Sequence, residues 1–322
     1  MINKVHLGDW TTNQLEDNSV QLIIADPPYF EVKGEFDFVW NSFDDYLKDV
    51  EKWAIECKRL LADNGTLFWY GDDKKIAYAQ IIFDKYFNLE NSLIWYKYNL
   101  RGGMFGSTGN DNVRSFPICT ERVLMYSQDS INLTTSIYHI RNYIREEIKK
   151  AKGKIVFKQV NQVFGTATNG GGVASACLSL DKTEPTMITK EMYIKLQKWC
   201  KPFLRKEYEE LRKEYEELRK EYEELRRPFS NKLNLNEVLQ YNTNTLNQYN
   251  HATVKPETLT RALIQTCSRK GDLVLVPFAG SGTECAMAAK EGREFIGFDI
   301  EPKYVDMANA RCSEHLKQTS LF

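Results

Sequence analysis

The sequence predicts an α/β protein built on a doubly wound, mostly parallel sheet. Short apolar runs that suit buried strands alternate with segments of helical periodicity in the first and last thirds of the chain. The run at 22–25 ends in two prolines, and the run at 272–276 ends in a glycine-rich turn. Between these two halves the alternation is lost, so we expect an inserted region that is largely helical.

The bulk properties are those of a soluble globular protein. The 322 residues, 42% hydrophobic and 27% charged, suggest about two domains. Seven cysteines lie scattered without a Cys-x-x-Cys pair, so neither a zinc site nor a disulfide framework is indicated, and a reducing cytoplasm is expected. No apolar run approaches the length of a membrane span. With a net charge of −1, any binding of nucleic acid must come from local basic patches.

The first 128 residues show the alternation of strands and helices most clearly. Apolar residues recur at helical spacing over 44–61, and Asn64-Gly65 closes this helix before the next strand. A second helix is expected at 76–83. The strands of this half are predicted at 2–9, 22–25, 66–70, 92–98 and 121–126.

Two polar features interrupt this half of the chain. Asp9 follows the first strand, where its carboxylate either binds a ligand or caps the turn. The stretch 98–116 is rich in glycine, has little apolar periodicity and carries Arg101 and Arg114. A loop of this length inside a compact domain is more often functional than structural. We therefore interpret it as a DNA-contacting segment that orders when DNA binds.

The middle of the chain carries a local excess of positive charge. The stretch 141–158 contains seven basic residues and two acidic ones. Such an excess either follows the phosphates of DNA or forms the solvated face of a helix. On the first interpretation Lys150, Lys152 and Lys154 are DNA contacts.

Three consecutive copies of KEYEELR occupy 206–226. Tyrosine and leucine alternate at spacings of three and four residues, which predicts a helix with a heptad stripe. The pairs Glu209–Lys213 and Glu216–Lys220, four residues apart, are expected to support it. We expect this helix to lie on its own domain rather than to form a dimeric zipper. Around it we predict a loop at 163–176, a helix at 190–201 capped by Thr189, and a linker at 231–250.

The last part of the chain predicts a unit that binds a nucleoside. Gly280 and Gly282 allow the backbone to approach a ligand at a helix N-terminus, and Asp299 lies nineteen positions after Gly280, where a carboxylate reaches ribose hydroxyls. The turn lacks the third glycine of dinucleotide sites and the Gly-Lys-Ser/Thr of phosphate loops, which favours S-adenosylmethionine over NAD or ATP. Helices are predicted at 257–267 and 283–290, and strands at 272–276 and 294–298.

The tetrapeptide Asp26-Pro27-Pro28-Tyr29 is the candidate catalytic segment. The prolines fix the backbone, so the Asp26 carboxylate and the Pro27 carbonyl could each accept one N–H of an exocyclic amine on a nucleobase. Tyr29 would stack on the face of the base. The alternative interpretation is a proline-ended strand cap with a surface tyrosine. If the segment is catalytic, Asp26 and the turn at Gly280 must lie at neighbouring strand ends.

DPPY at 26–29, FAGSGT at 278–283 and the acidic residue after Gly297-Phe298 together resemble the β class of S-adenosylmethionine-dependent DNA amino-methyltransferases. The resemblance covers about residues 1–128 and 250–315. It implies a Rossmann-like methyltransferase sheet, circularly permuted, with a catalytic half at 1–128 and a cofactor-binding half at 250–322. Residues 129–249, including the repeat at 206–226, would form the target-recognition region.

The resemblance also implies roles for individual residues. Asp26, Pro27, Pro28 and Tyr29 would be catalytic. The family usually has aspartate where this chain has Val276, and the missing carboxylate would weaken cofactor binding or be compensated elsewhere. The cofactor would be bound by residues from the strand ends and from the segment resembling HxTxKP: Asp9, Asp26, His251, Thr253, Lys255, Pro256, Phe278, Ala279, Gly280, Ser281, Gly282, Thr283 and Asp299.

The implied reaction is transfer of a methyl group to N6 of an adenine flipped out of duplex DNA. One alternative is cytosine-N4 methylation, although family members of that kind more often carry serine at the position of Asp26. Another is a non-catalytic DNA-binding protein of the same fold, motivated by Val276. No metal is required, and no Pro-Cys dipeptide supports cytosine-C5 chemistry. The expected partners are double-stranded DNA, a second copy of the chain and a cognate restriction endonuclease, but no membrane.

Overall fold

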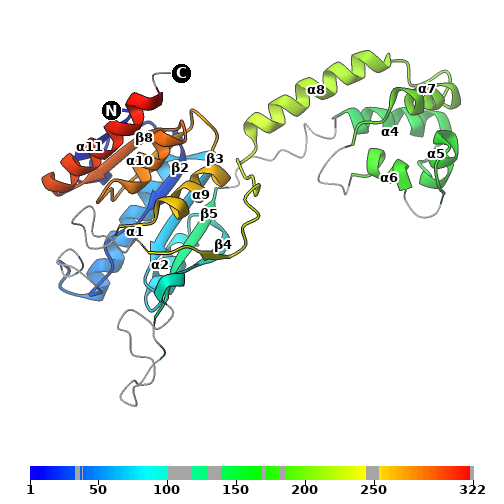
Figure 1. Ribbon diagram of the computed structural model, residues 1–322. Coiled ribbons are helices and arrows are strands. Elements are labelled where there is room, and N and C mark those ends of the chain that lie inside the picture. Colours follow the sequence, from blue (N-terminus) through cyan, green and yellow to red (C-terminus); the bar gives the residue numbers. More distant parts are fainter. Residues whose placement is uncertain are drawn as a thin grey trace. The chain divides into compact units, whose positions relative to one another are not determined.

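The computed structural model describes residues 1–32, 37, 39–100, 116, 118–128, 139–168, 172–180, 186–243 and 254–319. The chain divides into two compact units, which we call the sheet unit (1–130 with 227–322) and the helical unit (131–226) (Figure 1). Across the described ranges, no helix is both long and apolar enough to cross a membrane.

The sheet unit contains one eight-stranded sheet in the order β1-β8-β7-β2-β3-β5-β4-β6. The first five strands of this order are mutually parallel, β5 is antiparallel to both its neighbours, and β6 is parallel to β4. The prediction of a mostly parallel sheet is confirmed. The strands are β1 (Lys4–Leu7), β2 (Val20–Ala25), β3 (Leu61–Gly71), β4 (Asn88–Tyr96), β5 (Thr120–Ser127), β6 (Val238–Gln240), β7 (Leu273–Val276) and β8 (Glu294–Asp299).

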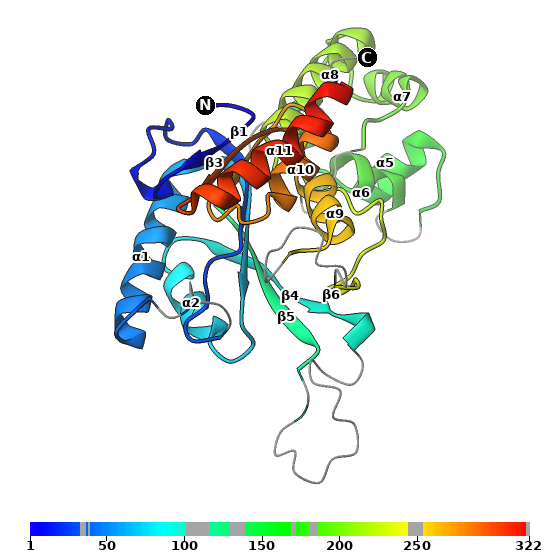
Figure 2. The same ribbon diagram turned by 60° about the vertical axis from the view of Figure 1, so that its left-hand side comes forward.

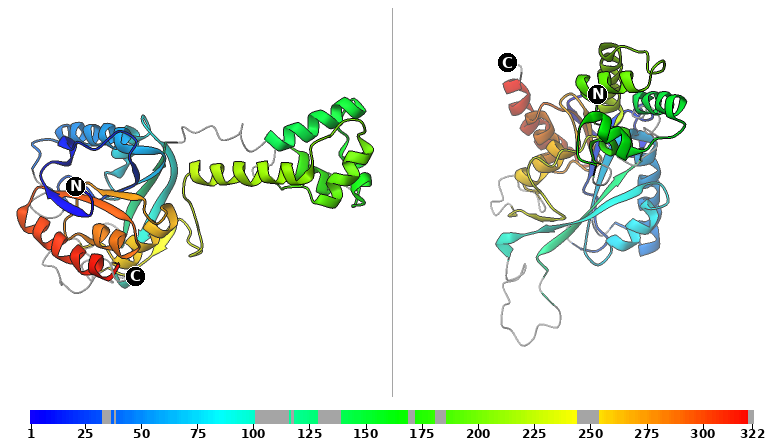
Figure 3. Two further views of the ribbon diagram at one scale, coloured as in Figure 1. Left: turned by 90° about the horizontal axis from the view of Figure 1, so that it is seen from above. Right: turned by 90° about the vertical axis from the view of Figure 1, so that its right-hand side faces the viewer.

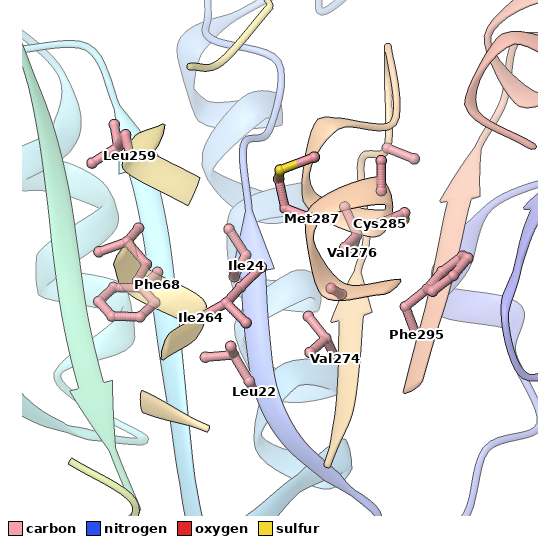
Figure 4. Packing of buried hydrophobic residues seen from close by; sticks show 14 of the residues in the cluster. Leu22, Ile24, Phe68, Leu259, Ile264, Val274, Val276, Cys285, Met287 and Phe295 are labelled. Carbon is pink, nitrogen blue, oxygen red and sulfur yellow. The ribbon is translucent and has the colours of Figure 1, made fainter. Parts of the chain in front are cut away.

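Helices cover both faces of this sheet, as a doubly wound fold requires (Figure 2). Alternate side chains of β2 point to opposite faces of the sheet. Ile23 packs with α1 and α2, whereas Leu22 and Ile24 pack with α9, α10 and α11. Figure 4 shows Leu22, Ile24 and Ile264 on the second of these faces. The helices are α1 (Phe43–Leu60), α2 (Ile76–Phe83), α9 (Glu257–Cys267), α10 (Thr283–Lys290) and α11 (Pro302–Thr319).

The described part of the helical unit consists of helices around its own core. Thr189 caps α7 as predicted, because its hydroxyl accepts a hydrogen bond from the Met192 N–H. The predicted loop at 163–176 is wrong at both ends: one helix extends to Phe164, and Ala174 and Cys177 bury one side of a short helix that begins at Gly172. The helices are α4 (His139–Lys152), α5 (Phe157–Phe164), α6 (Gly172–Leu178), α7 (Lys190–Trp199) and α8 (Tyr208–Leu225).

The heptad repeat forms α8, which lies against α4 and α7 of its own unit (Figure 3). Leu211 is fully buried and Leu218 packs partly on the same core, whereas Leu225 is 40% exposed. The predicted pairing of Glu209 with Lys213 is wrong: Glu209 forms its ion pair with Lys190 of α7 at 2.8 Å. The prediction that the stripe packs on its own domain is confirmed for its N-terminal part, as far as Leu218.

Strand β6 corrects the prediction of a linker at 231–250. It extends the sheet beyond β4, and the Trp95 indole N–H donates to the Tyr241 carbonyl at 2.8 Å. Only Leu239 of this strand is buried, so the local sequence lacks the apolar run of an interior strand. The strand predicted at 92–98 is shifted, since β4 ends at Tyr96 and a 3₁₀ turn, η3 (Tyr98–Leu100), follows.

Candidate active site

The sequence-predicted site residues follow four adjacent parallel strands. Asp9 comes after β1 and Asp299 ends β8. The segment 278–283, which we call the glycine turn, follows β7, and Asp26 follows β2. Strands β2 and β7 pair directly, with Leu22 opposite Val274. Because parallel strands end at one edge of a sheet, Asp26 and the glycine turn lie at neighbouring strand ends, as predicted.

Tyr29 is fixed by hydrogen bonds at both its backbone and its ring. Its hydroxyl donates to Asp26 Oδ1 at 2.7 Å, and its backbone N–H donates to the Asp37 carboxylate at 2.6 Å. Burial, reinforced by the negative charge of Asp26, raises the pKa of Tyr29 well above its usual value, so the hydroxyl remains a donor. Pro27 is buried and Pro28 half-buried between these two anchors. No motif in the sequence indicated the role of Asp37.

Asp26 belongs to a group of two buried lysines and two partly buried carboxylates, which we call the ion cluster: Asp26, Lys97, Glu121 and Lys255. The Lys255 ammonium pairs with Asp26 at 2.9 Å and with Glu121 at 3.1 Å. Lys97 pairs with the other oxygen of Glu121 at 2.9 Å. The Lys255 and Lys97 side chains are 5% and 7% exposed, so these pairs are largely shielded from water.

The ion cluster keeps Lys255 charged in spite of its burial. Burial acts to lower the pKa of Lys255, but Asp26 and Glu121 outweigh it and raise this pKa above its usual value. Burial likewise acts to raise the pKa of Glu121, but Lys255 and Lys97 hold it below its usual value. For Asp26 the effect of burial is larger than that of Lys255, and its pKa is raised. Lys255 was predicted from the resemblance, whereas Glu121 and Lys97 were missed because isolated charges at strand ends carry no motif.

Asp299 stabilises the glycine turn directly. Its carboxylate accepts the Gly280 N–H at 2.8 Å and the Glu301 N–H at 2.9 Å. The Ala279 N–H donates to the Phe298 carbonyl, which ties the turn to β8. Asp299 thus has a structural function here, and its bond to a ribose stays a prediction.

Gly282 is required by close packing as well as by its backbone conformation. Its φ is +75°, and a Cβ atom at this position would lie 2.6 Å from the Ala308 Cβ of α11. Arg311, also on α11, donates to the Thr283 hydroxyl at 2.8 Å and to the Ser281 carbonyl at 3.2 Å. The turn is therefore held from behind by α11, a contact that the motif did not reveal.

Three other predicted cofactor residues have structural contacts. Asp9 caps the 3₁₀ turn η1 (Trp10–Thr12) by accepting the Thr11 N–H at 2.9 Å, and it lines a cavity of about 280 Å³. The Phe278 ring packs edge-on against Trp53 with ring centres 5.0 Å apart. Pro256 is buried at the start of α9. Their cofactor contacts remain predictions.

The predicted DNA-contacting lysines lie at the C-terminal end of α4 and just beyond it. Lys150 pairs with Glu147 at 2.6 Å, Lys152 lies 4.8 Å from the centre of the Trp199 ring, and Lys154 is exposed. Arg141 and Arg145 contribute to the basic excess, but they donate to carbonyls at the end of α6 and are structural. Arg101, Arg114, His251 and Thr253 lie outside the described residues.

Comparison with known proteins gives matches along most of the chain. The DNA adenine methyltransferase YhdJ of Escherichia coli K12 is 25% identical over 301 residues, which cover 91% of this chain and 76% of YhdJ. The type II methyltransferase M1.MboII of Moraxella bovis is 27% identical over 316 residues, which cover 96% of this chain and 95% of the relative.

Two solved structures share the fold. The Thermus thermophilus protein TTHA0409, complexed with S-adenosyl-L-methionine, superposes with a TM-score of 0.52 at 17% identity, covering 97% of this chain and 95% of that one. The cytosine-N4-specific PvuII DNA methyltransferase gives a TM-score of 0.53 at 12% identity, covering 98% and 91%.

A family model described as DNA methylase matches residues 20–310. This match includes DPPY, the glycine turn and the ion cluster that joins Asp26 to Lys255. The chain therefore belongs to the N6/N4 DNA methylase family.

Proposed function

We propose that the protein is a site-specific DNA adenine-N6 methyltransferase that uses S-adenosylmethionine. The observation that carries this proposal is the position of Asp26-Pro27-Pro28-Tyr29 beside the glycine turn, on the directly paired strands β2 and β7. The relative YhdJ is named a DNA adenine methyltransferase, which supports adenine as the target. Asp26, rather than serine, at the first position of the tetrapeptide supports the same choice.

The residues at the four strand ends fit such a cofactor chemically. The glycines of the turn let a ligand approach the backbone closely at a helix N-terminus, and Asp9 and Asp299 are acceptors suited to adenine and ribose. When bound, the cofactor supplies an electrophilic methyl group on a sulfonium. The residues proposed to hold it are Asp9, Lys255, Pro256, Phe278, Ala279, Gly280, Ser281, Gly282, Thr283 and Asp299.

The protein's own residues position the amino group that is to be methylated. Asp26 and the Pro27 carbonyl accept its two N–H groups, which withdraws the nitrogen lone pair from conjugation with the ring. Lys255 and the Tyr29 hydroxyl hold the Asp26 carboxylate in place at 2.9 and 2.7 Å. Holding the amine in line for transfer accounts for much of the rate enhancement expected of such a site. The carboxylate also stabilises the positive charge that develops on nitrogen.

The helical unit is proposed to recognise the DNA target. Lys150, Lys152 and Lys154 would contact phosphates, which position a protein on DNA without reading its sequence. The relative M1.MboII is named a type II methyltransferase, so we also propose that this chain works beside a cognate restriction endonuclease. Action as a homodimer, in the cytoplasm, completes the proposal.

The test is transfer of labelled methyl from S-adenosylmethionine to duplex DNA of mixed sequence, followed by identification of the modified base. Label in N6-methyladenine is the expected result. Label in N4-methylcytosine would assign the cytosine-N4 activity instead. Retarded DNA without incorporated label would indicate a DNA-binding protein that has lost catalysis.

Asp26→Asn separates catalysis from cofactor binding. We expect transfer to fall by about 10²–10³-fold, because a neutral amide stabilises developing positive charge poorly. The dissociation constant of the cofactor, measured by calorimetry, should change little. A comparable loss of cofactor binding would show instead that Asp26 is needed for the shape of the site.

A further inference from the structure

Two polar oxygen atoms near the ion cluster are buried without hydrogen-bond partners among the described residues. Glu284, in the first turn of α10, is 5% exposed, and among the described residues nothing hydrogen-bonds to its Oε1. Tyr70, on β3, is fully buried, and its hydroxyl likewise finds no partner in the described part of the chain. Buried polar atoms of this kind are rare because they have lost their water without gaining a replacement. They indicate a position that something else fills.

This position adjoins the proposed methyl-transfer site. Lys255, which is ion-paired with Asp26, lies with its ammonium 4.9 Å from the centre of the Tyr70 ring. Asp26 and Lys255 both influence the ionisation of Glu284, and Glu284 is the charge with the strongest effect on Tyr70. The Glu284 carboxylate therefore lies within electrostatic reach of the Asp26 carboxylate.

No lysine or arginine of the described residues forms an ion pair with the Glu284 carboxylate. Within the ion cluster two carboxylates face two ammonium groups. Arg311 is held by Glu257 at 2.6 Å and by the Thr283 hydroxyl at 2.8 Å. The titratable and charged groups coupled to Glu284 are Asp26 on β2, Tyr70 on β3, Cys285 on α10, Lys255 before α9 and Arg311 on α11.

The ionisation of Glu284 reflects this imbalance. Burial raises its pKa to about 7 and Asp26 adds to the effect, whereas a hydrogen bond from its own backbone N–H, Lys255 and Arg311 reduce it. A carboxylate with this pKa is about half-protonated at neutral pH. Any cation that binds beside it favours the charged form and displaces the proton.

We propose that Glu284 binds the cationic end of the cofactor, and this proposal rests on the function proposed above. S-adenosylmethionine carries two cationic groups, the ammonium of its methionine part and the sulfonium. The ammonium would donate a charge-assisted hydrogen bond to the buried carboxylate, whereas the sulfonium, which has no N–H, would attract it by charge alone. The proposal assigns to Glu284 a role that the FAGSGT motif, which ends one residue earlier, does not include.

Glu284 also accounts for the departure at Val276. The resemblance led us to expect a carboxylate at position 276, whereas Val276 is 1% exposed and packs in the apolar core. Helix α10, which carries Glu284, packs on β7, and Figure 4 shows Val276 near Cys285 and Met287 of that helix. The negative charge missing from the strand is thus supplied by the helix that follows it.

Calorimetry of cofactor binding tests the proposal without measuring activity. Titrations at about pH 7, in buffers of different ionisation enthalpy, give the number of protons released per cofactor bound. We expect the whole protein to release about half a proton at this pH. Glu284→Gln should release none and should bind the cofactor about ten- to a hundredfold more weakly, since it loses the attraction between the carboxylate and the cation.

S-adenosylhomocysteine, which keeps the ammonium but lacks the sulfonium, identifies the cation. Proton release with both ligands supports the ammonium as the partner, and release with S-adenosylmethionine alone supports the sulfonium. Glu191→Gln serves as the matched control, because Glu191 is also a glutamate in the first turn of a helix but is exposed and belongs to the helical unit. It should behave as the wild type.

Three results would overturn the proposal. The wild type could bind cofactor without releasing protons, or Glu284→Gln could keep wild-type affinity and proton release. The third concerns folding. A carboxyl group whose pKa is raised by folding destabilises the folded protein once it is charged. In the absence of cofactor, Glu284→Gln should therefore be at least as stable as the wild type at about pH 8. A clear loss of stability would assign Glu284 a structural role instead. Failure of the wild type to bind the cofactor at all would contradict the proposed function itself.

Discussion

Lys255 is the residue on which the charge balance of the candidate active site depends. Its ammonium pairs with both Asp26 and Glu121, and its side chain is 5% exposed. Removing one partner of a buried ion pair is strongly destabilising, because the remaining charge stays buried without compensation. Asp26 would lose its ion pair, whereas Glu121 would keep the one that it forms with Lys97.

Lys255→Met is therefore expected to lower the free energy of unfolding by about 3–5 kcal/mol at neutral pH. The deficit should shrink as the pH falls. In the wild type the pKa of Glu121 is lowered by folding, so its stabilisation is present at neutral pH and is lost as the pH falls through that lowered pKa. In the variant the unpaired carboxylates can take up protons at acid pH, which removes their buried charge.

Urea unfolding at about pH 7.5 and about pH 5 measures this dependence. Lys48→Met is the control, because the Lys48 side chain is 70% exposed in its pair with Asp45 and such pairs contribute little. An equal deficit at both pH values would show that Lys255 acts through the packing of its aliphatic chain rather than through its charge.

Among the elements, the contact between the glycine turn and α11 explains why the turn keeps its shape. Gly282 has a left-handed conformation, and the Ala308 Cβ lies 2.6 Å from the place where its own Cβ would be. Gly271 has a similar φ of +83°, but no atom lies within 4 Å of its Cβ position. Substituting alanine at each glycine therefore distinguishes the energetic cost of the left-handed conformation, present at both, from that of the steric conflict with Ala308, present only at Gly282.

Gly271→Ala should lower the free energy of unfolding by about 1–2 kcal/mol, the cost of a left-handed alanine. Gly282→Ala should add a further 1–3 kcal/mol or so for the steric conflict with α11, and it should weaken cofactor binding. Denaturant unfolding and calorimetry of both variants provide the comparison. Equal losses of stability would show that α11 moves aside without cost.

The elements that were predicted well are those with clear start and stop signals. Helices α9 and α10 have the predicted bounds because Pro256 and Gly282 mark where they begin. Strand β6 and helix α6 were missed because both are short; β6 forms only by pairing with the distant β4, and α6 is buried only by packing on α4 and α5. Similarly, DPPY and FAGSGT could be read locally, whereas the ion cluster depends on Lys97, Glu121 and Lys255 meeting across the fold.

For the molecule as a whole, a net charge of −1 leaves DNA binding to local groups. Lys154 is exposed beyond the end of α4, whereas Lys150 is already paired with Glu147. Lys154→Ala is therefore expected to reduce the slope of log K for DNA binding against log salt concentration by about 1, with little change in sequence preference. Lys150→Ala should reduce it less.

Fluorescence anisotropy with labelled duplexes over a range of salt concentrations gives these slopes. Lys48→Ala, on α1 of the sheet unit, should leave the slope unchanged. A slope unchanged in the Lys154 and Lys150 variants would mean that this basic segment is merely a solvated helix face.

The pairing of β2 with β7 has a consequence for synthesis on the ribosome. Strand β2 and its acidic tip emerge early, whereas β7, the glycine turn and Asp299 emerge only after the whole helical unit has been translated. Domains generally begin folding from the N-terminal end during synthesis, so β2 must wait with one edge uncovered. A nascent chain therefore cannot modify DNA, and competence begins only when β7 and β8 have left the exit tunnel.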